Sequence, residues 1–194
     1  TYVLCHPYPL YGGDMYNKVL VKVAGVLARK KYAVLRYNMR GVGASTGSMA
    51  VAGQDRADLS RILQWLLEKK TPGPVRLAGY SYGAYIAMSL LSQPDTPGQP
   101  VGISLIRGII TIACPYNLPE FRLNSFPGMP IEIIQGTHDE LIPAAALKRS
   151  LRELDAVKEP CWVQGADHCF NGKLLELEEA FLGCVERMSG QAGS

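Results

Sequence analysis

The sequence predicts an α/β fold in which a mostly parallel central sheet carries helices on both faces. Short apolar runs of strand length alternate with longer segments whose apolar residues recur at helical spacing, which is the pattern of βαβ units. The short runs are almost continuously aliphatic or β-branched, as expected of strands that helices cover on both sides. With 194 residues and 47% hydrophobic content, the chain has enough apolar material for one domain with a single core.

Each strand is expected where an apolar run is bounded by turn-forming residues. These runs cover residues 2–5, 33–37, 75–78, 106–113, 131–135 and 161–164. Helices are expected between and after them, at residues 17–30, 55–69, 83–92, 143–154 and 174–188. The helical pattern is clear in the second of these, because Leu59, Leu63 and Leu66 share one face and a Thr-Pro-Gly-Pro sequence follows.

The remaining segments have the composition of loops. Residues 39–53 are rich in Gly and Ser, and residues 93–102 contain repeated Pro and Gly, so both are expected to be surface connections. We expect the single domain to span residues 1–189 and residues 190–194 to form a flexible tail.

Composition argues against several classes of partner. The formal net charge is only +3 and like charges do not cluster, so nucleic-acid binding is not indicated. No apolar stretch approaches the roughly 18 residues of a membrane-spanning helix, so we expect no membrane association. The five cysteines are odd in number and contain no CxxC pair, which predicts neither a disulfide framework nor a zinc site and suggests a reducing, cytoplasmic location. The sequence indicates no cofactor, and it does not predict an oligomeric state.

Ser81 lies in a pattern typical of a catalytic nucleophile. The sequence Gly79-Tyr80-Ser81-Tyr82-Gly83 is a G-x-S-x-G motif that follows a predicted strand and leads into a predicted helix. Such a serine occupies a strained turn whose flanking residues pass close to their neighbours, which explains the two glycines. The alternative is an ordinary glycine-rich turn. The strand before the motif and the helix after it favour the nucleophile.

A serine nucleophile needs a base that an acid orients, and the sequence offers both. His168 is expected in the loop after the last strand, and Asp139 follows the strand at 131–135. The chain order of Ser81, Asp139 and His168 is nucleophile, acid and base, with each residue beyond the carboxyl end of a strand. We therefore expect all three at one rim of the sheet.

Other assignments of the acid and the base remain open at this point. Asp167 adjoins His168, and Glu140 adjoins Asp139, so either could supply the acid, while His138 could supply the base. Adjacent residues seldom present their side chains to each other, which argues against Asp167. His168 could also be a solvated loop residue, and Asp139 could be a helix cap ahead of residue 143.

The loop after the first strand is a candidate for stabilising an oxyanion. It reads Cys-His-Pro-Tyr-Pro-Leu-Tyr-Gly-Gly from residue 5, and its two prolines have no N–H group. The donor would then be Tyr8 or, as an alternative, Leu10. The second donor would be the N–H of Tyr82, directly after the nucleophile. His6 is expected to anchor this loop rather than to react.

Five motifs in order resemble one family. They are His-Pro-x-Pro-Leu-Tyr-Gly-Gly from residue 6, Asn-x-Arg-Gly-Val-Gly-x-Ser-x-Gly from residue 38, Gly-Tyr-Ser-Tyr-Gly-Ala from residue 79, Gly-x-x-Asp ending at residue 139, and Asp-His ending at residue 168. Together they resemble the small lidless α/β-hydrolases, variously called dienelactone-hydrolase-like or serine-aminopeptidase-like. The resemblance implies an α/β-hydrolase fold without a lid domain and a triad of Ser81, His168 and Asp139.

Two features depart from that family. Its members usually begin with one or two antiparallel strands before the His-Pro loop, and these N-terminal strands are missing here. True dienelactone hydrolases have a cysteine nucleophile, where this sequence has Ser81, which argues against that particular activity.

The resemblance and the triad suggest hydrolysis of an acyl bond, a carboxylic ester or a thioester, in a small-molecule substrate. Only about 17 residues connect the strands at 106–113 and 131–135, too few for a lid, so an open pocket is expected. Aromatic residues near the motifs are expected to line this pocket, namely Tyr8, Tyr11, Tyr82, Tyr116, Phe121 and Phe170. Of these, Tyr11, Tyr116 and Phe170 are expected to bind the substrate. Cys169 beside His168 makes only two potential ligands and no metal site, so a buried or semi-buried thiol is expected there.

Two further classes compete with a small-molecule hydrolase. The first is a non-catalytic hydrolase-like module for protein interaction, which would usually lack a triad member, whereas this sequence has a candidate for each. The second is a peptidase, which would need a substrate-binding cap or propeller that 194 residues do not contain.

Overall fold

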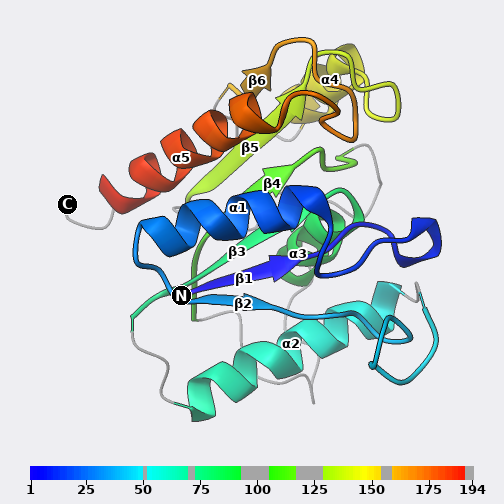
Figure 1. The fold of residues 1–194 in the computed structure, drawn as a ribbon, viewed down its shortest axis with the longest axis vertical. Coiled ribbons are helices and arrows are strands. Elements are labelled where there is room, and N and C mark those ends of the chain that lie inside the picture. Colours follow the sequence, from blue (N-terminus) through cyan, green and yellow to red (C-terminus); the bar gives the residue numbers. More distant parts are fainter. Residues whose placement is uncertain (50–51, 70–72, 93–104, 117–128, 154–158, 191–194) are drawn as a thin grey trace.

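The computed structural model describes residues 1–49, 52–69, 73–92, 105–116, 129–153 and 159–190, and Figure 1 shows their arrangement. The strands form one six-stranded sheet in the order β2-β1-β3-β4-β5-β6, and every neighbouring pair is parallel. Their bounds are β1 Tyr2–Cys5, β2 Val34–Arg36, β3 Val75–Tyr80, β4 Ile106–Ile112, β5 Ile131–Gly136 and β6 Cys161–Val163. The predicted parallel α/β sheet is therefore confirmed.

Helices cover both faces of this sheet. Their bounds are α1 Lys18–Arg29, α2 Ala52–Glu68, α3 Tyr82–Ser92, α4 Ala144–Glu153 and α5 Leu174–Gly190. In Figure 1, α1 and α5 lie side by side in front of the sheet, while α3 lies behind it and contacts α2. The described residues of the central strands β1 and β3 are buried throughout, as their aliphatic composition predicts.

The strand order reverses at β1, which positions the candidate site. From β1 the chain moves outward to β2 and then crosses to β3 on the other side of β1. Ligands of open α/β sheets bind beyond the carboxyl ends of the strands at such a reversal. Cys5 at the end of β1 pairs with Gly79 near the end of β3, so the loop after residue 5 lies beside the loop that carries Ser81.

The described segments differ from the predicted ones mainly at their ends. Helix α2 begins at Ala52, three residues before the predicted start, and its first turn includes the exposed Gly53. A short 3-10 helix, η1, spans Pro9–Tyr11 and was not predicted. The predicted loop at 93–102 lies outside the described residues. Of the predicted tail at 190–194, Gly190 is the last residue of α5, and residues 191–194 lie outside the described residues.

The loop after β2 is fixed to α2 by Arg40. Its guanidinium donates to both carboxylate oxygens of Asp58, at 2.8 and 2.7 Å, and to the side chain of Gln54 at 2.6 Å. Gly41 and Gly43 have φ values of 74° and 58°, a conformation that favours glycine. The Arg40 motif thus forms a structural turn next to the candidate site. None of the described helices is both long and apolar enough to cross a membrane.

Candidate active site

Ser81 occupies the single position between β3 and α3. Its φ of 52° is in the left-handed region, which a non-glycine residue adopts only at a cost. Its backbone is held on both sides, because its N–H donates to the Ile112 carbonyl at 2.8 Å and its carbonyl accepts the Tyr85 N–H at 3.0 Å. The strained turn that the motif predicts is therefore present, and it lies at the carboxyl edge of the sheet.

The two glycines of the motif allow two different close approaches. A Cβ at Gly79 would lie 2.5 Å from the backbone of Ala84, and a Cβ at Gly83 would lie 2.1 Å from the Cys5 carbonyl oxygen. Gly79 therefore lets the first turn of α3 return against β3, and Gly83 lets that turn touch the end of β1. Because both contacts are with backbone atoms, no side-chain movement could relieve them.

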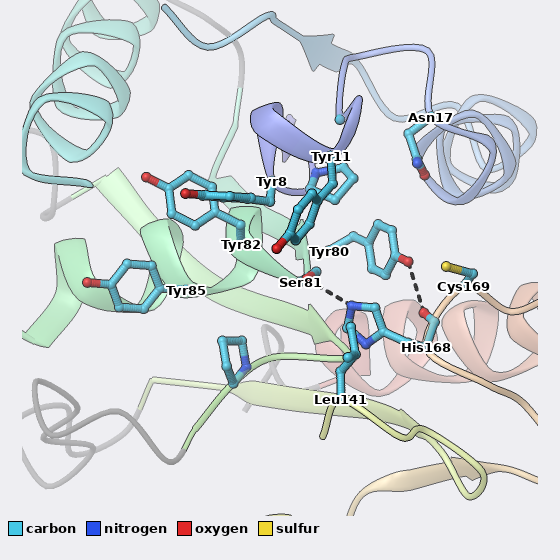
Figure 2. A pocket seen from close by; sticks show the side chains of 13 residues that line it. Tyr8, Tyr11, Asn17, Tyr80, Ser81, Tyr82, Tyr85, Leu141, His168 and Cys169 are labelled. Atoms are coloured by element: carbon cyan, nitrogen blue, oxygen red, sulfur yellow. Dashed lines mark hydrogen bonds between the residues drawn. The ribbon is translucent and has the colours of Figure 1, made fainter. Parts of the chain in front are cut away.

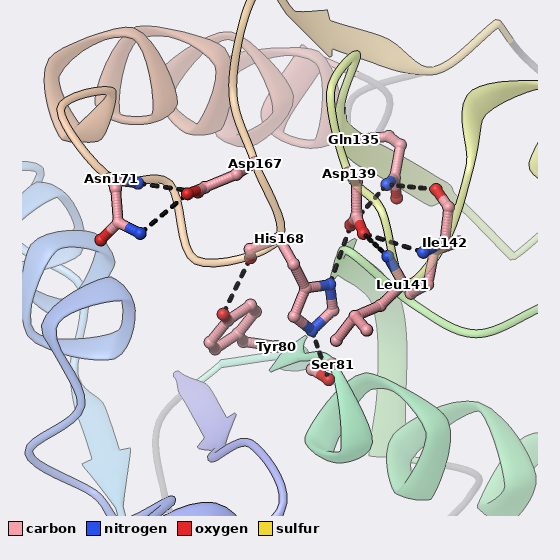
Figure 3. Close-up of polar contacts among 9 residues, drawn as sticks. All are labelled: Tyr80, Ser81, Gln135, Asp139, Leu141, Ile142, Asp167, His168 and Asn171. Carbon is pink, nitrogen blue, oxygen red and sulfur yellow. Dashed lines mark hydrogen bonds and ion pairs between the residues drawn. The ribbon is translucent and has the colours of Figure 1, made fainter.

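Ser81, His168 and Asp139 form a continuous hydrogen-bonded chain (Figure 3). The His168 Nε2 atom lies 3.0 Å from the Ser81 Oγ atom, and the Nδ1 atom lies 2.8 Å from the Asp139 Oδ2 atom. The loops after β3, β5 and β6 supply the three residues, so the parallel sheet brings together positions far apart in the sequence. His168 thus links the Asp139 carboxylate to the Ser81 hydroxyl group.

Asp139 is buried among hydrogen-bond donors. Its Oδ1 atom accepts the N–H groups of Leu141 at 3.0 Å and Ile142 at 2.8 Å. Its Oδ2 atom accepts Gln135 Nε2 at 2.8 Å in addition to His168. Four donors around two oxygens match the acceptor capacity of an ionised carboxylate. Asp139 consequently closes the turn at residues 139–142 and also holds the imidazole. It is not the cap of the following helix, because α4 begins only at Ala144 and the two N–H groups that Asp139 accepts precede it.

The alternative acids and bases point elsewhere. The Asp167 carboxylate accepts hydrogen bonds from the backbone and side chain of Asn171, at 2.9 and 2.7 Å, and the backbone bond is the main reason that the Asp167 pKa is lowered. His138 and Glu140 are both exposed. Of the candidates that the sequence leaves open, His168 is the base that contacts Ser81, and Asp139 is the acid that contacts His168.

His6 anchors the loop after β1. Its Nδ1–H donates to the Pro7 carbonyl at 2.8 Å, and its Nε2 atom accepts the Met39 N–H at 2.9 Å. These partners require a neutral imidazole with its proton on Nδ1. Burial also lowers the pKa of His6, which favours the same neutral form. The expectation that His6 is a loop anchor is therefore confirmed.

Two backbone N–H groups near Ser81 are available for an anionic oxygen. Within the described residues, the N–H groups of Tyr8 and Tyr82 have no hydrogen-bond acceptor. Tyr82 begins α3, where the first amides of a helix lack partners and favour negative charge. Tyr8 precedes η1, and Leu10, the other candidate donor, lies within η1 with its side chain 60% exposed.

A cavity of about 480 Å³ opens in front of Ser81 (Figure 2). Tyr8, Tyr11, Tyr82 and Tyr85 line it, and their rings pack in sequence with centroids 5.0 to 5.8 Å apart. Tyr11 is 88% exposed and forms part of the rim. No lysine, arginine, aspartate or glutamate is among the described residues that line this cavity.

Two of the predicted substrate-binding residues do not reach the cavity. Phe170 is fully buried and packs edge-on against Tyr80, and Tyr116 is buried with its hydroxyl 2.8 Å from Thr111 Oγ1. The prediction that these two line the pocket is therefore wrong, because their rings fill the core below it. Phe121 lies outside the described residues.

The expectation for Cys169 also needs correction. Its side chain is exposed and lines the cavity beside His168, so it is not a buried or semi-buried thiol. Among the described residues, the one group of three potential metal ligands is Glu132, Cys161 and Cys184, and it contains no residue of the Ser81 site.

A buried acid behind the cavity was missed by the sequence analysis. The Tyr82 hydroxyl donates to Asp55 Oδ2 at 2.7 Å, and Asp55 is only 1% exposed. A signal was present, since Asp55 lies on the same helical face as Leu59 and Leu66, where an apolar residue would be expected. Within the described residues, the Oδ1 atom of Asp55 has no hydrogen-bond partner, so the carboxylate depends on the bond from Tyr82 to its Oδ2 atom.

Replacing Tyr82 with phenylalanine is expected to lower the free energy of unfolding at pH 7 by about 1–3 kcal/mol, the usual cost of a buried polar group that loses its partner. Burial raises the pKa of Asp55 above its ordinary 3.8, whereas the Tyr82 hydrogen bond lowers it. Because the pKa of Asp55 is higher in the folded protein than the ordinary 3.8, the folded state loses stability as the pH rises above 3.8 and through that higher pKa. Without the Tyr82 hydrogen bond, this loss of stability should be larger. The difference from wild type should therefore shrink towards pH 4.

Urea unfolding of both proteins across this pH range would measure the effect. Tyr11→Phe is the matched control, because its ring is 88% exposed and its variant should differ by less than about 0.5 kcal/mol. An equal loss at every pH would contradict the assignment to Asp55.

Known proteins resemble this chain over most of its length. The family model described as alpha/beta hydrolase fold matches residues 3–129. An uncharacterized protein of Rickettsia prowazekii (strain Madrid E) is 30% identical over 188 residues, which cover 92% of this chain and 75% of that protein.

Two solved structures are similar in both sequence and fold. An alpha-beta serine hydrolase homologue from Coxiella burnetii is 30% identical with a TM-score of 0.78, and the match covers 94% of this chain and 83% of that one. A serine hydrolase without a lid from Xanthomonas campestris is 28% identical with a TM-score of 0.79, over 96% of this chain and 80% of that one.

Proposed function

Because the chain belongs to the α/β hydrolase fold family, we propose that it is a serine hydrolase that cleaves an acyl bond, a carboxylic ester or a thioester, in a small substrate. The observation that carries this proposal is the unbroken chain from Ser81 Oγ through His168 to Asp139, with distances of 3.0 and 2.8 Å. A nucleophile, a base and an orienting acid within hydrogen-bonding distance are the requirements for serine catalysis.

The hydrogen bonds determine which way the protons move. The Asp139 carboxylate can only accept, so His168 carries its proton on Nδ1 and presents an unprotonated Nε2 to Ser81. As Ser81 Oγ attacks the acyl carbon, its proton passes to Nε2, and the carboxylate stabilises the resulting imidazolium. The imidazolium then protonates the departing alcohol or thiol. In the second half of the reaction, His168 accepts a proton from a water molecule as that water attacks the acyl-enzyme. This step releases the carboxylic acid and restores Ser81.

The oxyanion formed in both attacks would be held by the N–H groups of Tyr8 and Tyr82. One of them follows the nucleophile at the start of α3, and the other belongs to the loop that His6 anchors. Two donors from separate elements can converge on one oxygen only if the loop after β1 is fixed relative to α3. The close backbone contact between Gly83 and the Cys5 carbonyl fixes the loop after β1 relative to α3.

The cavity limits the substrate that this site can take. Its volume of about 480 Å³ is typical of small-molecule sites, and aromatic rings form most of its wall. Since no charged lysine, arginine or carboxylate lines the described part of the cavity, nothing there would compensate a charged acyl group. We infer an uncharged and mainly apolar acyl or leaving group.

Labelling with a fluorophosphonate probe, together with hydrolysis of p-nitrophenyl acetate, tests the proposed function. The probe should modify Ser81 in the wild type, and Ser81→Ala should abolish both labelling and hydrolysis. Ser189→Ala is the matched control, because this serine lies on α5 and bonds to Tyr32, and it should leave both signals unchanged. A wild-type protein that reacts no faster than Ser81→Ala would refute the proposal.

Replacing Tyr8 with proline is expected to lower kcat about 100- to 1,000-fold, the effect typical of losing one oxyanion donor. Tyr8 has a φ of −56°, close to the value that proline imposes, so the substitution removes the N–H without forcing the backbone to change. Tyr8→Ala is the matched control, since it removes the same ring and keeps the N–H. Equal kcat values for the two variants in p-nitrophenyl acetate hydrolysis would exclude the Tyr8 amide as a donor.

A further inference from the structure

Two cysteines are in contact outside the Ser81 site. Cys161 in β6 and Cys184 in α5 have their sulfur atoms 3.7 Å apart, although 23 residues separate them in the sequence. Cys161 is partly exposed, and Cys184 is buried. Among the described residues, no other two cysteine sulfurs are in contact. The pair therefore combines a thiol that a small reagent can reach with a second thiol directly behind it.

Arg187 holds a positive charge against both sulfur atoms. One guanidinium nitrogen lies 2.8 Å from Cys161 Sγ and 3.2 Å from Cys184 Sγ. The same side chain is fixed by Glu132, a nearly buried carboxylate on β5 whose Oε2 atom is 2.7 Å away. A guanidinium group can only donate hydrogen bonds, so both sulfur atoms act as acceptors in these contacts.

The contacts indicate which sulfur carries the negative charge. The hydrogen bond from the Cys184 thiol, and then the charge of Arg187, lower the pKa of Cys161. The pKa of Cys184 is raised, first by its hydrogen bond to Cys161 and then by burial. Cys161 Sγ is also the closer of the two sulfurs to the Arg187 nitrogen, at 2.8 Å against 3.2 Å, and Cys161 is the more exposed residue. Geometry and pKa direction therefore both favour Cys161 as the thiolate and Cys184 as the thiol. A partly exposed thiolate beside a protonated thiol is the arrangement found in redox-active pairs.

We propose that Cys161 and Cys184 form a redox-active pair that hydrogen peroxide converts reversibly to a disulfide. The Cys161 thiolate attacks one peroxide oxygen and breaks the O–O bond, which yields a sulfenic acid and hydroxide. The Cys184 sulfur then attacks the sulfenic sulfur, and the S–OH bond breaks to release water with the Cys184 proton. The pair loses two electrons and peroxide gains them. A dithiol reductant reverses the reaction by thiol-disulfide exchange.

A metal site is the other chemistry that these residues could support. The ligand atoms of Glu132, Cys161 and Cys184 all lie within 4.8 Å of one another. The Arg187 guanidinium, however, already donates to both sulfurs and to the carboxylate. A divalent cation would have to displace this fixed positive charge from all three ligands. The contacts therefore favour the dithiol over a metal centre.

The remaining cysteines explain why the reaction should be selective. Cys5 and Cys114 are buried, and burial raises the pKa of both thiols, which makes them poor nucleophiles. Cys169 is exposed but, among the described residues, has no second sulfur beside it to form a disulfide. Cys169 is thus the main competitor for peroxide, and the experiment must remove it.

The test uses the full chain with Cys169→Ser, reduced and then treated with a small excess of hydrogen peroxide. Trypsin cleaves after Lys158, Lys173 and Arg187, so Cys161 and Cys184 fall in the adjacent peptides 159–173 and 174–187. The expected product is these two peptides joined by a disulfide that dithiothreitol separates. Retention of free Cys161 and Cys184 thiols after treatment, or oxidation of Cys161 without a disulfide, would overturn the proposal.

Three further arms test the steps separately. Cys184→Ser in the same background should stop at a Cys161 sulfenic acid that dimedone captures, and Cys161→Ser should leave Cys184 reduced. Arg187→Gln should slow disulfide formation on the order of tenfold, because the thiolate loses its cation. One equivalent of zinc chloride should give no protection against peroxide, and full protection would identify the cluster as a metal site instead. Circular dichroism would confirm that each variant is folded.

Discussion

Asp139→Asn is expected to lower kcat for p-nitrophenyl acetate about 10⁴-fold with little change in KM or in the fold. Leu141 and Ile142 donate their N–H groups to one carboxylate oxygen, so the carbonyl oxygen of the asparagine would take that position. Its NH₂ group would then face His168 Nδ1, where the carboxylate oxygen had been. Two donors cannot bond to each other, so His168 would have to move its proton to Nε2 and could no longer accept from Ser81.

Asp167→Asn is the matched control for this prediction. It makes the same chemical change one residue from His168, at a carboxylate that bonds only to Asn171 among the described side chains and loses no contact with the imidazole. We expect its kcat to stay within about threefold of wild type. If the Asp167 variant were the impaired one and the Asp139 variant active, the acid would have been assigned to the wrong residue.

The arrangement of the candidate catalytic residues could be predicted from the sequence because each part is a local pattern with a structural cause. A serine on a strained turn needs small residues around it, and the loops after parallel strands converge at one edge regardless of their separation in the sequence. These two rules together predict that Ser81, Asp139 and His168 lie at the same edge of the sheet. The strands and helices follow in the same way from the spacing of apolar residues.

The walls of the cavity could not be predicted in this way, because burial of an aromatic residue depends on packing from elements distant in the sequence. Phe170 follows His168 by two residues, yet its backbone has a left-handed φ of 53° and its ring is fully buried in the core. The sequence does place a carboxylate, Asp55, on an otherwise apolar helical face, but only its contact with Tyr82 explains why it is there. Nothing in the sequence indicates that Cys161 and Cys184 are in contact, because one lies in strand β6 and the other in helix α5.

Gly83→Ala is expected to lower the free energy of unfolding by at least about 3 kcal/mol, in the range for severe overpacking. The added Cβ would lie 2.1 Å from the Cys5 carbonyl oxygen and 2.5 Å from the His6 carbonyl oxygen. Since both are backbone atoms of the loop after β1, the only relief is for α3 and that loop to separate. That separation would also move the two amides proposed to bind the oxyanion apart, so kcat should fall in whatever fraction stays folded.

Gly53→Ala separates this effect from the general consequence of adding a methyl group. Gly53 lies in α2, and a Cβ there would meet nothing within 4 Å, so alanine should leave stability unchanged or raise it by about 0.5–1 kcal/mol. Urea unfolding and p-nitrophenyl acetate hydrolysis of both variants would measure the contrast. A Gly83 variant with wild-type stability and activity would show that α3 and the loop after β1 can separate freely. The backbone contact at Gly83 would then not be what sets the distance between the Tyr8 and Tyr82 amides.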